Sequence, residues 1–170
     1  MGRPNRACGT GGERGVALVE FALVAPILLV ILLALLDFGK VFNYWIDETH
    51  LASSGARLAV VNSAPGACPD GSTAATLQAY IKCQADTGEL RAGGSSTTGA
   101  RVCISFPPVT GHSSPLVGDP VRVTVWANYR WLPLIGEKIS RASADIVGEA
   151  TMRLEAVPTR YTADPSSCRP

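Results

Sequence analysis

One ionisable side chain, Glu20, lies inside the most apolar stretch of this 170-residue sequence. The stretch runs from Val16 to Leu36, and Glu20 is the only charged residue in it. A carboxyl group inside a bilayer is costly, so such a residue is by default functional and in need of a partner. The alternative is that Glu20 reaches the water interface, because it lies only four residues after Val16.

The other residues that could do chemistry form no catalytic pattern. The sequence has no phosphate-binding P-loop, no G-x-S-x-G nucleophile elbow and no H-E-x-x-H zinc motif. Asp47 and Glu48 are adjacent carboxylates in a predicted helix, and we interpret them as solvated. His50 and His112 are far from the cysteines in sequence, which disfavours a metal site. We therefore expect no enzyme, no cofactor and no metal, and the net charge of +1 gives no reason to expect nucleic acid binding.

The segment from Val16 to Leu36 predicts one membrane-spanning helix. Its 21 residues would rise about 31 Å, close to the hydrocarbon thickness of a bilayer. A buried core helix is the first alternative, but Leu28–Leu36 is apolar on every side and a small domain could not cover it. A removable secretory signal is the second alternative; its apolar region is normally shorter and ends in a small-residue cleavage site, which is missing here.

The charges that flank the apolar segment predict its orientation. The preceding residues carry a net charge of +2 and the following residues carry −2, from Arg3, Arg6, Arg14 and Glu13 before the span, and Lys40, Asp37, Asp47 and Glu48 after it. Because basic flanks stay cytoplasmic, we expect a single-pass anchor in the bacterial inner membrane with the C-terminal part outside the cytoplasm. Tyr44 and Trp45 are candidates for the outer interface, where aromatic rings concentrate.

The residues around Glu20 resemble the processing site of type IV pilin-like proteins. Gly15 precedes the apolar run and Phe21 follows Glu20, which is the G-x-x-x-x-E-F form used by the Flp/Tad branch. The resemblance implies that a prepilin peptidase cuts after Gly15, with the helix beginning after the cut. Val16 would then carry an α-ammonium group that pairs with Glu20 of a neighbouring subunit, and Phe21 completes this assembly signal.

A longer stretch, Arg14–Pro26, is similar to the start of TadE-like proteins. Further segments resemble that family in the same order along the chain: Asp37–Lys40, Leu51–Arg57 and Ala150–Glu155. The resemblance implies a pseudopilin or minor pilin of a tight-adherence (Flp-type) pilus in the cell envelope, with TadE- or TadF-like proteins and Flp pilin as partners. The alternative is an unprocessed, membrane-anchored extracytoplasmic domain that binds or senses something.

Residues 37–62 predict a continuation of the helix beyond the membrane, since apolar residues recur there at helical spacing. One face of this helix carries small residues that allow close packing, namely Ala52, Gly55, Ala56 and Ala59. This face could pack against the rest of the same chain or against another subunit, and both could hold on different faces.

The remaining sequence predicts a short helix over Thr73–Cys83 and three strands. The strands are expected at Arg101–Phe106, Val121–Trp131 and Ile139–Glu155, with a turn at Pro133–Lys138 and a bulge around Gly148. We therefore expect an α+β fold, with three antiparallel strands packed on the long helix, similar to pilin heads. The expected organisation is a leader (1–15), the span (16–36), a helix extension (37–62), a head (63–157) and a C-terminal tail (158–170).

The cysteines predict disulfide bonds in the part of the chain outside the cytoplasm. Cys8 precedes the span, whereas four cysteines follow it and would lie where disulfides persist. Three pairings of these four are possible. We favour Cys68 with Cys83, which closes a local loop, and Cys103 with Cys168, which ties the C-terminal tail to a strand. Free thiols or a metal site are the alternatives.

Overall fold

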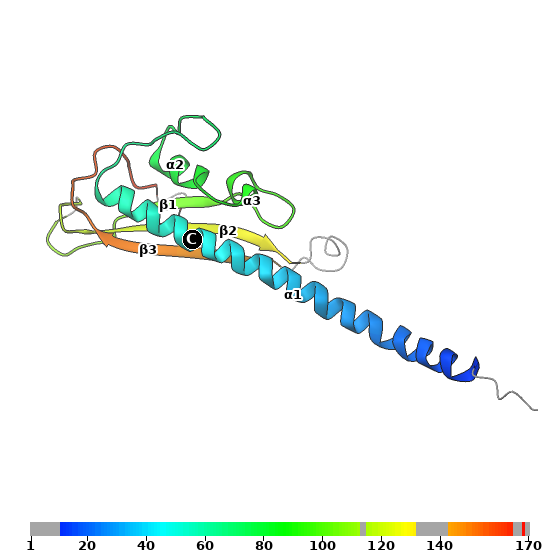
Figure 1. Cartoon of the computed structure of the whole chain (residues 1–170). Coiled ribbons are helices and arrows are strands. Elements are labelled where there is room, and N and C mark those ends of the chain that lie inside the picture. Colours follow the sequence, from blue (N-terminus) through cyan, green and yellow to red (C-terminus); the bar gives the residue numbers. More distant parts are fainter. Residues whose placement is uncertain (1–10, 113–114, 132–142, 165–167, 169–170) are drawn as a thin grey trace, which may run out of the picture. The chain divides into compact units, whose positions relative to one another are not determined.

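A computed structural model of the chain describes residues 11–112, 115–131, 143–164 and 168 (Figure 1). The predicted turn at Pro133–Lys138, Cys8 and the first residues of the last predicted strand lie outside the described residues. The chain divides into two compact units, Met1–Phe38 and Gly39–Pro170. We refer to them as the stem and the head and describe each by itself.

The longest element is α1 (Gly11–Val60), which supplies the stem helix and the first helix of the head. Leucine and alanine dominate its sequence and favour helix, and Pro26 is the one proline inside it. The helix ends where Asn62 adopts a left-handed φ of 51° and the backbone N–H of Ser63 bonds back to the carbonyl of Leu58. The predicted continuation of the apolar segment into a long helix is confirmed.

The head contains a three-stranded antiparallel sheet in the order β1-β2-β3. The strands are β1 (Arg101–Ser105), β2 (Pro120–Arg130) and β3 (Ser143–Arg153). Alternate residues of β2 are fully buried: Val121, Val123, Val125, Ala127 and Tyr129. Because successive side chains of a strand point to opposite faces, one face of the sheet packs toward the core, as the sequence pattern predicted. The α+β fold class is confirmed.

The predicted bulge at Gly148 is wrong. The pairing of β2 with β3 runs without interruption through Val125 and Gly148, so no extra residue is inserted there. Gly148 is instead the point where α1 crosses the sheet. A Cβ atom at Gly148 would overlap the backbone carbonyl of Glu48 and lie 2.5 Å from the backbone nitrogen of Thr49. The absence of a side chain therefore lets the helix backbone approach the sheet.

The small-residue face of α1 packs inside the head, with Ala52, Ala56 and Ala59 fully buried. Gly55 on the same face lies under Ile81 of α2 (Leu77–Cys83), since a Cβ at Gly55 would be 2.8 Å from Cδ1 of Ile81. Helix α2 begins later than the predicted Thr73 because the hydroxyl of Thr76 accepts a hydrogen bond from the backbone N–H of Ala79 and caps the helix. Of the two packing partners considered for this face, the head of the same chain is the one observed.

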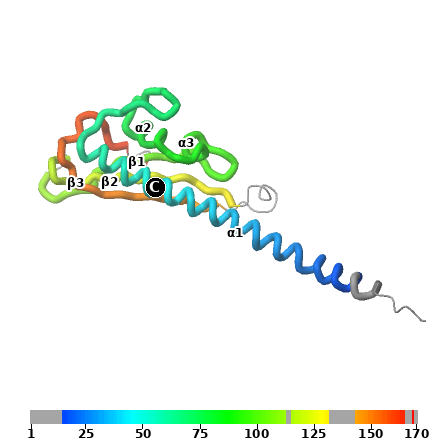
Figure 2. Tube along the Cα trace, viewed as in Figure 1, coloured from blue at the N-terminus to red at the C-terminus, as the bar shows by residue number. Residues whose placement is uncertain are grey.

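The cysteines of the head are joined in two disulfides, Cys68–Cys83 and Cys103–Cys168. These are the two pairings favoured in the sequence analysis. The segment after β3 returns beside the end of α1 and then beside β1 (Figure 2). Along this path the backbone N–H of Glu155 donates to the carbonyl of Val60, and that of Asp164 donates to the carbonyl of Ile104. The C-terminal segment is thus part of the packed head.

Candidate functional site

The predicted processing and assembly residues all lie in one exposed stretch of the stem helix. The side chains of Val16 and Phe21 are 59% and 69% exposed, and Gly15 and Glu20 are also exposed. A Cβ at Gly15 would meet no atom within 4 Å. The expectation that the helix begins after Gly15 is wrong, because α1 already begins at Gly11. Gly15 therefore lies within the first turns of the helix.

Helical spacing places Glu20 on the same face as Val16, one turn further along α1. In the part of the chain that the structure describes, no hydrogen bond or ion pair involves the Glu20 carboxyl group. Its neighbours along the helix are apolar and exposed, with Leu23 71% and Val24 59% exposed. The carboxylate is therefore presented on an apolar surface, where it is available to a cation from outside the chain.

The rest of the predicted span likewise has an exposed apolar surface. Within the described residues one helix is long and apolar enough to cross a membrane, and no residue from 16 to 36 is buried. Large apolar side chains project on all sides, among them Leu28 at 51% and Leu35 at 63% exposure. Such a surface needs an apolar environment, either lipid or other apolar helices.

The interpretation of Asp47 and Glu48 as solvated residues is wrong. Both are buried, with 6% and 0% of their surface exposed. Asp47 accepts hydrogen bonds from the backbone N–H groups of Asp86 and Thr87 at 3.2 and 3.0 Å, and from the hydroxyl of Thr87 at 3.0 Å. These bonds fix the start of α3 (Gly88–Ala92), a helix that the sequence analysis did not predict. The partners are remote in sequence, so no local pattern could have revealed them.

Glu48 is enclosed between α1 and the sheet, next to Gly148. Neither oxygen of its carboxyl group has a hydrogen-bond partner among the described residues. Burial, and secondarily the charge of Asp47, raises the pKa of Glu48 to about 9. The side chain is therefore neutral at physiological pH and contributes to the core, not to a surface site.

Tyr44 is not available as an interfacial residue, contrary to the sequence-based expectation. Its ring is 8% exposed and packs against Tyr129 of β2, with ring centroids 5.7 Å apart. Its hydroxyl donates a 2.9 Å hydrogen bond to Glu89 of α3. Burial and this carboxylate raise the pKa of Tyr44 to about 12. Trp45 points the other way and is 47% exposed.

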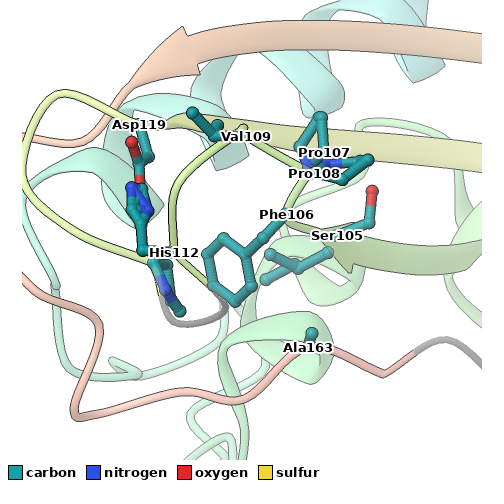
Figure 3. Close-up of a pocket in the computed structure, with 10 residues that line it drawn as sticks. Ser105, Phe106, Pro107, Pro108, Val109, His112, Asp119 and Ala163 are labelled. Carbon is teal, nitrogen blue, oxygen red and sulfur yellow. The ribbon is translucent and has the colours of Figure 1, made fainter.

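A pocket of about 420 Å³ lies at the end of β1, and the sequence analysis did not anticipate it (Figure 3). Most of its lining is apolar and comes from the residues that follow β1, while Ala163 of the C-terminal segment closes one side. The polar residues of the lining are Ser105, His112 and Asp119, and Nε2 of His112 lies 3.1 Å from Oδ2 of Asp119. Among the described residues no group of three His, Cys, Asp or Glu side chains could hold a metal ion.

Comparison with known proteins gives one match. Residues 15–57 match the family model described as TadE-like protein. The range starts at the predicted cleavage residue, Gly15, and ends at Arg57 within α1, so it contains none of the sheet. The resemblance identified from the sequence is confirmed over this range, whereas Ala150–Glu155 lies outside it. Neither the curated proteins nor the solved structures include a significant match to this chain.

Proposed function

Because residues 15–57 form a TadE-like segment, we propose that the protein is a pseudopilin or minor pilin that takes part in assembly of a tight-adherence (Flp-type) pilus. The TadE-like match supports a role related to this pilus in general. The observation that carries the specific proposal is Gly15 with Glu20-Phe21 at the start of a helix whose apolar surface is entirely unburied. No catalytic role is part of the proposal.

The stem anchors the protein in the membrane before assembly. A single apolar helix near the N-terminus supports a single-pass anchor. We propose that the N-terminus is cytoplasmic and the head extracytoplasmic, because the basic residues precede the span. The two disulfides of the head agree with this orientation, since disulfides persist outside the reducing cytoplasm.

Processing by a prepilin peptidase would remove the leader by cutting the peptide bond between Gly15 and Val16. This bond lies in the helix that begins at Gly11, so the first turns must open before a peptidase can bind the backbone in an extended form. The start of a helix frays readily, and a glycine at the cut leaves the backbone unobstructed. The cut creates an α-ammonium at Val16.

Glu20 then supplies the charge that pairs with a neighbouring subunit. Within one chain, Glu20 and Val16 lie on the same face of α1, separated by one turn. An offset between two packed stems of about one helical turn would bring the α-ammonium of one chain to the carboxylate of the next. Such a pair relieves the cost of two charges among apolar helices and makes register specific. TadE- or TadF-like proteins and Flp pilin are the proposed partners.

The mature N-terminus tests the processing step. The protein is purified from cells with and without the prepilin peptidase, and its N-terminal peptide is identified by mass spectrometry. We expect Val16 as the first residue only when the peptidase is present. An intact leader in a piliated strain would rule out the processing step.

A matched pair of carboxylate variants tests assembly. Glu20→Ala should abolish co-purification with the pilin-like partners and reduce surface pili, because the α-ammonium of a neighbour loses its counter-charge. Glu155→Ala removes an exposed carboxylate of the head. It should leave co-purification with the partners and the number of surface pili unchanged. Normal pili in the Glu20→Ala strain would contradict the proposal.

A second candidate function follows from the pocket beside His112 and Asp119. Its volume of about 420 Å³ is within the usual range for small-molecule sites. The pocket supports ligand binding, which is the role of the alternative function, an unprocessed, membrane-anchored extracytoplasmic domain. Wild-type assembly with Glu20→Ala, together with loss of a surface phenotype when Val109→Trp fills the pocket, would favour this function over the first.

A further inference from the structure

The part of α1 that belongs to the head has a compact aromatic face turned away from the core. It consists of Phe42, Trp45 and Ile46, which are 50%, 47% and 50% exposed. We call these three residues the aromatic face. The rings of Phe42 and Trp45 contact each other, with centroids 5.7 Å apart. The opposite side of the same helix carries Tyr44 and Leu51, which are buried in the head.

The aromatic face follows the apolar segment of the stem closely along the chain. Phe42 and Trp45 come six and nine residues after Leu36. Because α1 is helical through these residues, six residues rise only about 9 Å, so Phe42 lies close to the headgroup layer of a membrane whose hydrocarbon core ends at Leu36. Tryptophan concentrates at membrane interfaces because its ring is apolar and its N–H needs a polar partner.

We propose that the aromatic face contacts the outer headgroup layer of the bilayer and seats the head on the membrane surface. The proposal depends on the membrane anchoring in the proposed function and does not depend on pilus assembly. It assigns the interfacial contact to Phe42, Trp45 and Ile46 in place of Tyr44. Phe42 and Ile46 contribute apolar area. The indole N–H of Trp45 has no hydrogen-bond partner among the described residues and can bond to lipid carbonyl or phosphate oxygens.

The size of the face favours lipid over a second copy of the protein. Three large side chains that are half exposed offer on the order of 300 Å², whereas a stable protein interface covers about 800 Å² on each partner. Toward the end of α1 the next exposed positions, Thr49 and Arg57, are polar, so the apolar area does not extend further into the head. In the other direction Phe38, one helical turn before Phe42, is 61% exposed, so the face continues the apolar surface of the proposed span. A lipid interface has no minimum contact area and accepts a small aromatic face.

Fluorescence of Trp45 in vesicles tests the contact directly. The full chain carries Trp126→Phe and Trp131→Phe, so that Trp45 is its only tryptophan, and is reconstituted in phosphatidylcholine–phosphatidylglycerol vesicles. Some vesicles contain lipids brominated at defined depths in the acyl chain. We expect Trp45 emission to be shifted to shorter wavelength and quenched most by the shallowest bromine. Replacing Phe42 and Ile46 by serine should reduce both effects.

Two reporters placed in a Trp45→Phe version of this background act as controls. Leu28→Trp lies in the proposed span and should be quenched most by deep bromines, while Arg57→Trp lies at an exposed position further along α1 and should not be quenched. If Leu28→Trp is not quenched, membrane anchoring itself is wrong. If Leu28→Trp is quenched and Trp45 is not, only the inference about the aromatic face is overturned.

Protein density separates lipid contact from subunit contact. The blue shift of Trp45 should be the same at high and low lipid-to-protein ratios if lipid covers it. A shift that appears only at high protein density would show that another chain covers the face and would overturn the inference.

Discussion

Two adjacent carboxylates, Asp47 and Glu48, show how strongly single residues depend on their surroundings. Both are buried on α1, yet they have opposite roles. Asp47 accepts three hydrogen bonds from the segment before α3. Glu48 has no hydrogen-bond partner among the residues the structure describes. The first carboxylate organises a loop, and the second is tolerated in the core because it is protonated.

Glu48→Gln should make the stability of the head less dependent on pH. The pKa of Glu48 is raised from 4.5 to about 9, so the folded state holds a proton that the unfolded chain releases. The contribution of Glu48 to stability is therefore greatest at acidic pH and falls as pH rises from about 4.5 to about 9, by up to about 1.4 kcal/mol per pH unit. Glutamine cannot ionise and should remove this slope.

The measurement is urea unfolding of the head in the detergent-solubilised full chain at pH 5, 7 and 9. The advantage of the glutamine variant should grow with pH. An equal difference in free energy of unfolding at all three values would show that Glu48 is already ionised in the folded state.

Asp47→Ala should destabilise the segment that precedes α3. Three donors lose a charged acceptor in a buried position, which costs about 1–3 kcal/mol. Asp86→Ala changes an exposed carboxylate in the same segment and should stay within about 0.5 kcal/mol of wild type. Hydrogen exchange of the amides of residues 84–92 provides the local readout, and equal protection in both variants would argue against the capping role.

At the scale of elements, α1 uses different surfaces in its two parts. Between Val16 and Leu36 no side is buried, whereas the part in the head buries a face of small residues against the sheet and α2. Small side chains allow this because they bring the helix backbone close to its neighbours. The backbone of α1 comes very close to β3 at Gly148, where backbone atoms of Glu48 occupy the space that a Cβ atom would need.

Gly148→Ala should push α1 away from β3. The added methyl group would overlap backbone atoms, which cannot move aside as a flexible side chain can, and overpacking of this kind costs about 1–3 kcal/mol or more. Gly88→Ala is the matched control, because a Cβ there meets nothing within 4 Å and Gly88 is the first residue of α3. Thermal unfolding should show a lower midpoint for the first variant alone; equal midpoints would refute the close-packing argument.

At the scale of the whole molecule, the surfaces of the stem and the head are suited to different environments. The stem has the surface of a helix that needs lipid or other helices, while the head has a core of its own and two disulfides. The disulfides close loops of very different length, with sequence separations of 15 and 65 residues. A longer loop loses more conformational freedom in the unfolded chain when it is closed.

Removing the two disulfides separately should therefore have unequal effects. Replacing Cys68 and Cys83 by alanine should cost about 3 kcal/mol, and replacing Cys103 and Cys168 should cost about 4 kcal/mol in the chain-entropy description. Denaturant unfolding of each double variant in detergent gives the comparison. A larger loss from the first pair would show that native contacts, and not loop entropy, decide the stability of this head.

The sequence alone determined the features that depend on local composition and spacing. A long apolar run gives a helix with an exposed apolar surface, and alternation in β2 gives a half-buried strand. The stretch Arg14–Pro26 gives the TadE-like resemblance, in agreement with the family match over residues 15–57. Each can be identified because the information lies within one or a few turns of chain. The start of α1 before Gly15 was missed, since helix ends are weakly specified by local sequence.

The tertiary structure decided the features that depend on residues far apart in the chain. The burial of Asp47, Glu48 and Tyr44 follows from elements that pack on α1 from 40 to 100 residues later in the sequence. No helical pattern distinguishes these side chains from solvated ones, because the same polar residues are common on exposed faces. The role of Gly148 was likewise misread as a bulge, since only the crossing of α1 over β3 reveals why a side chain is excluded there.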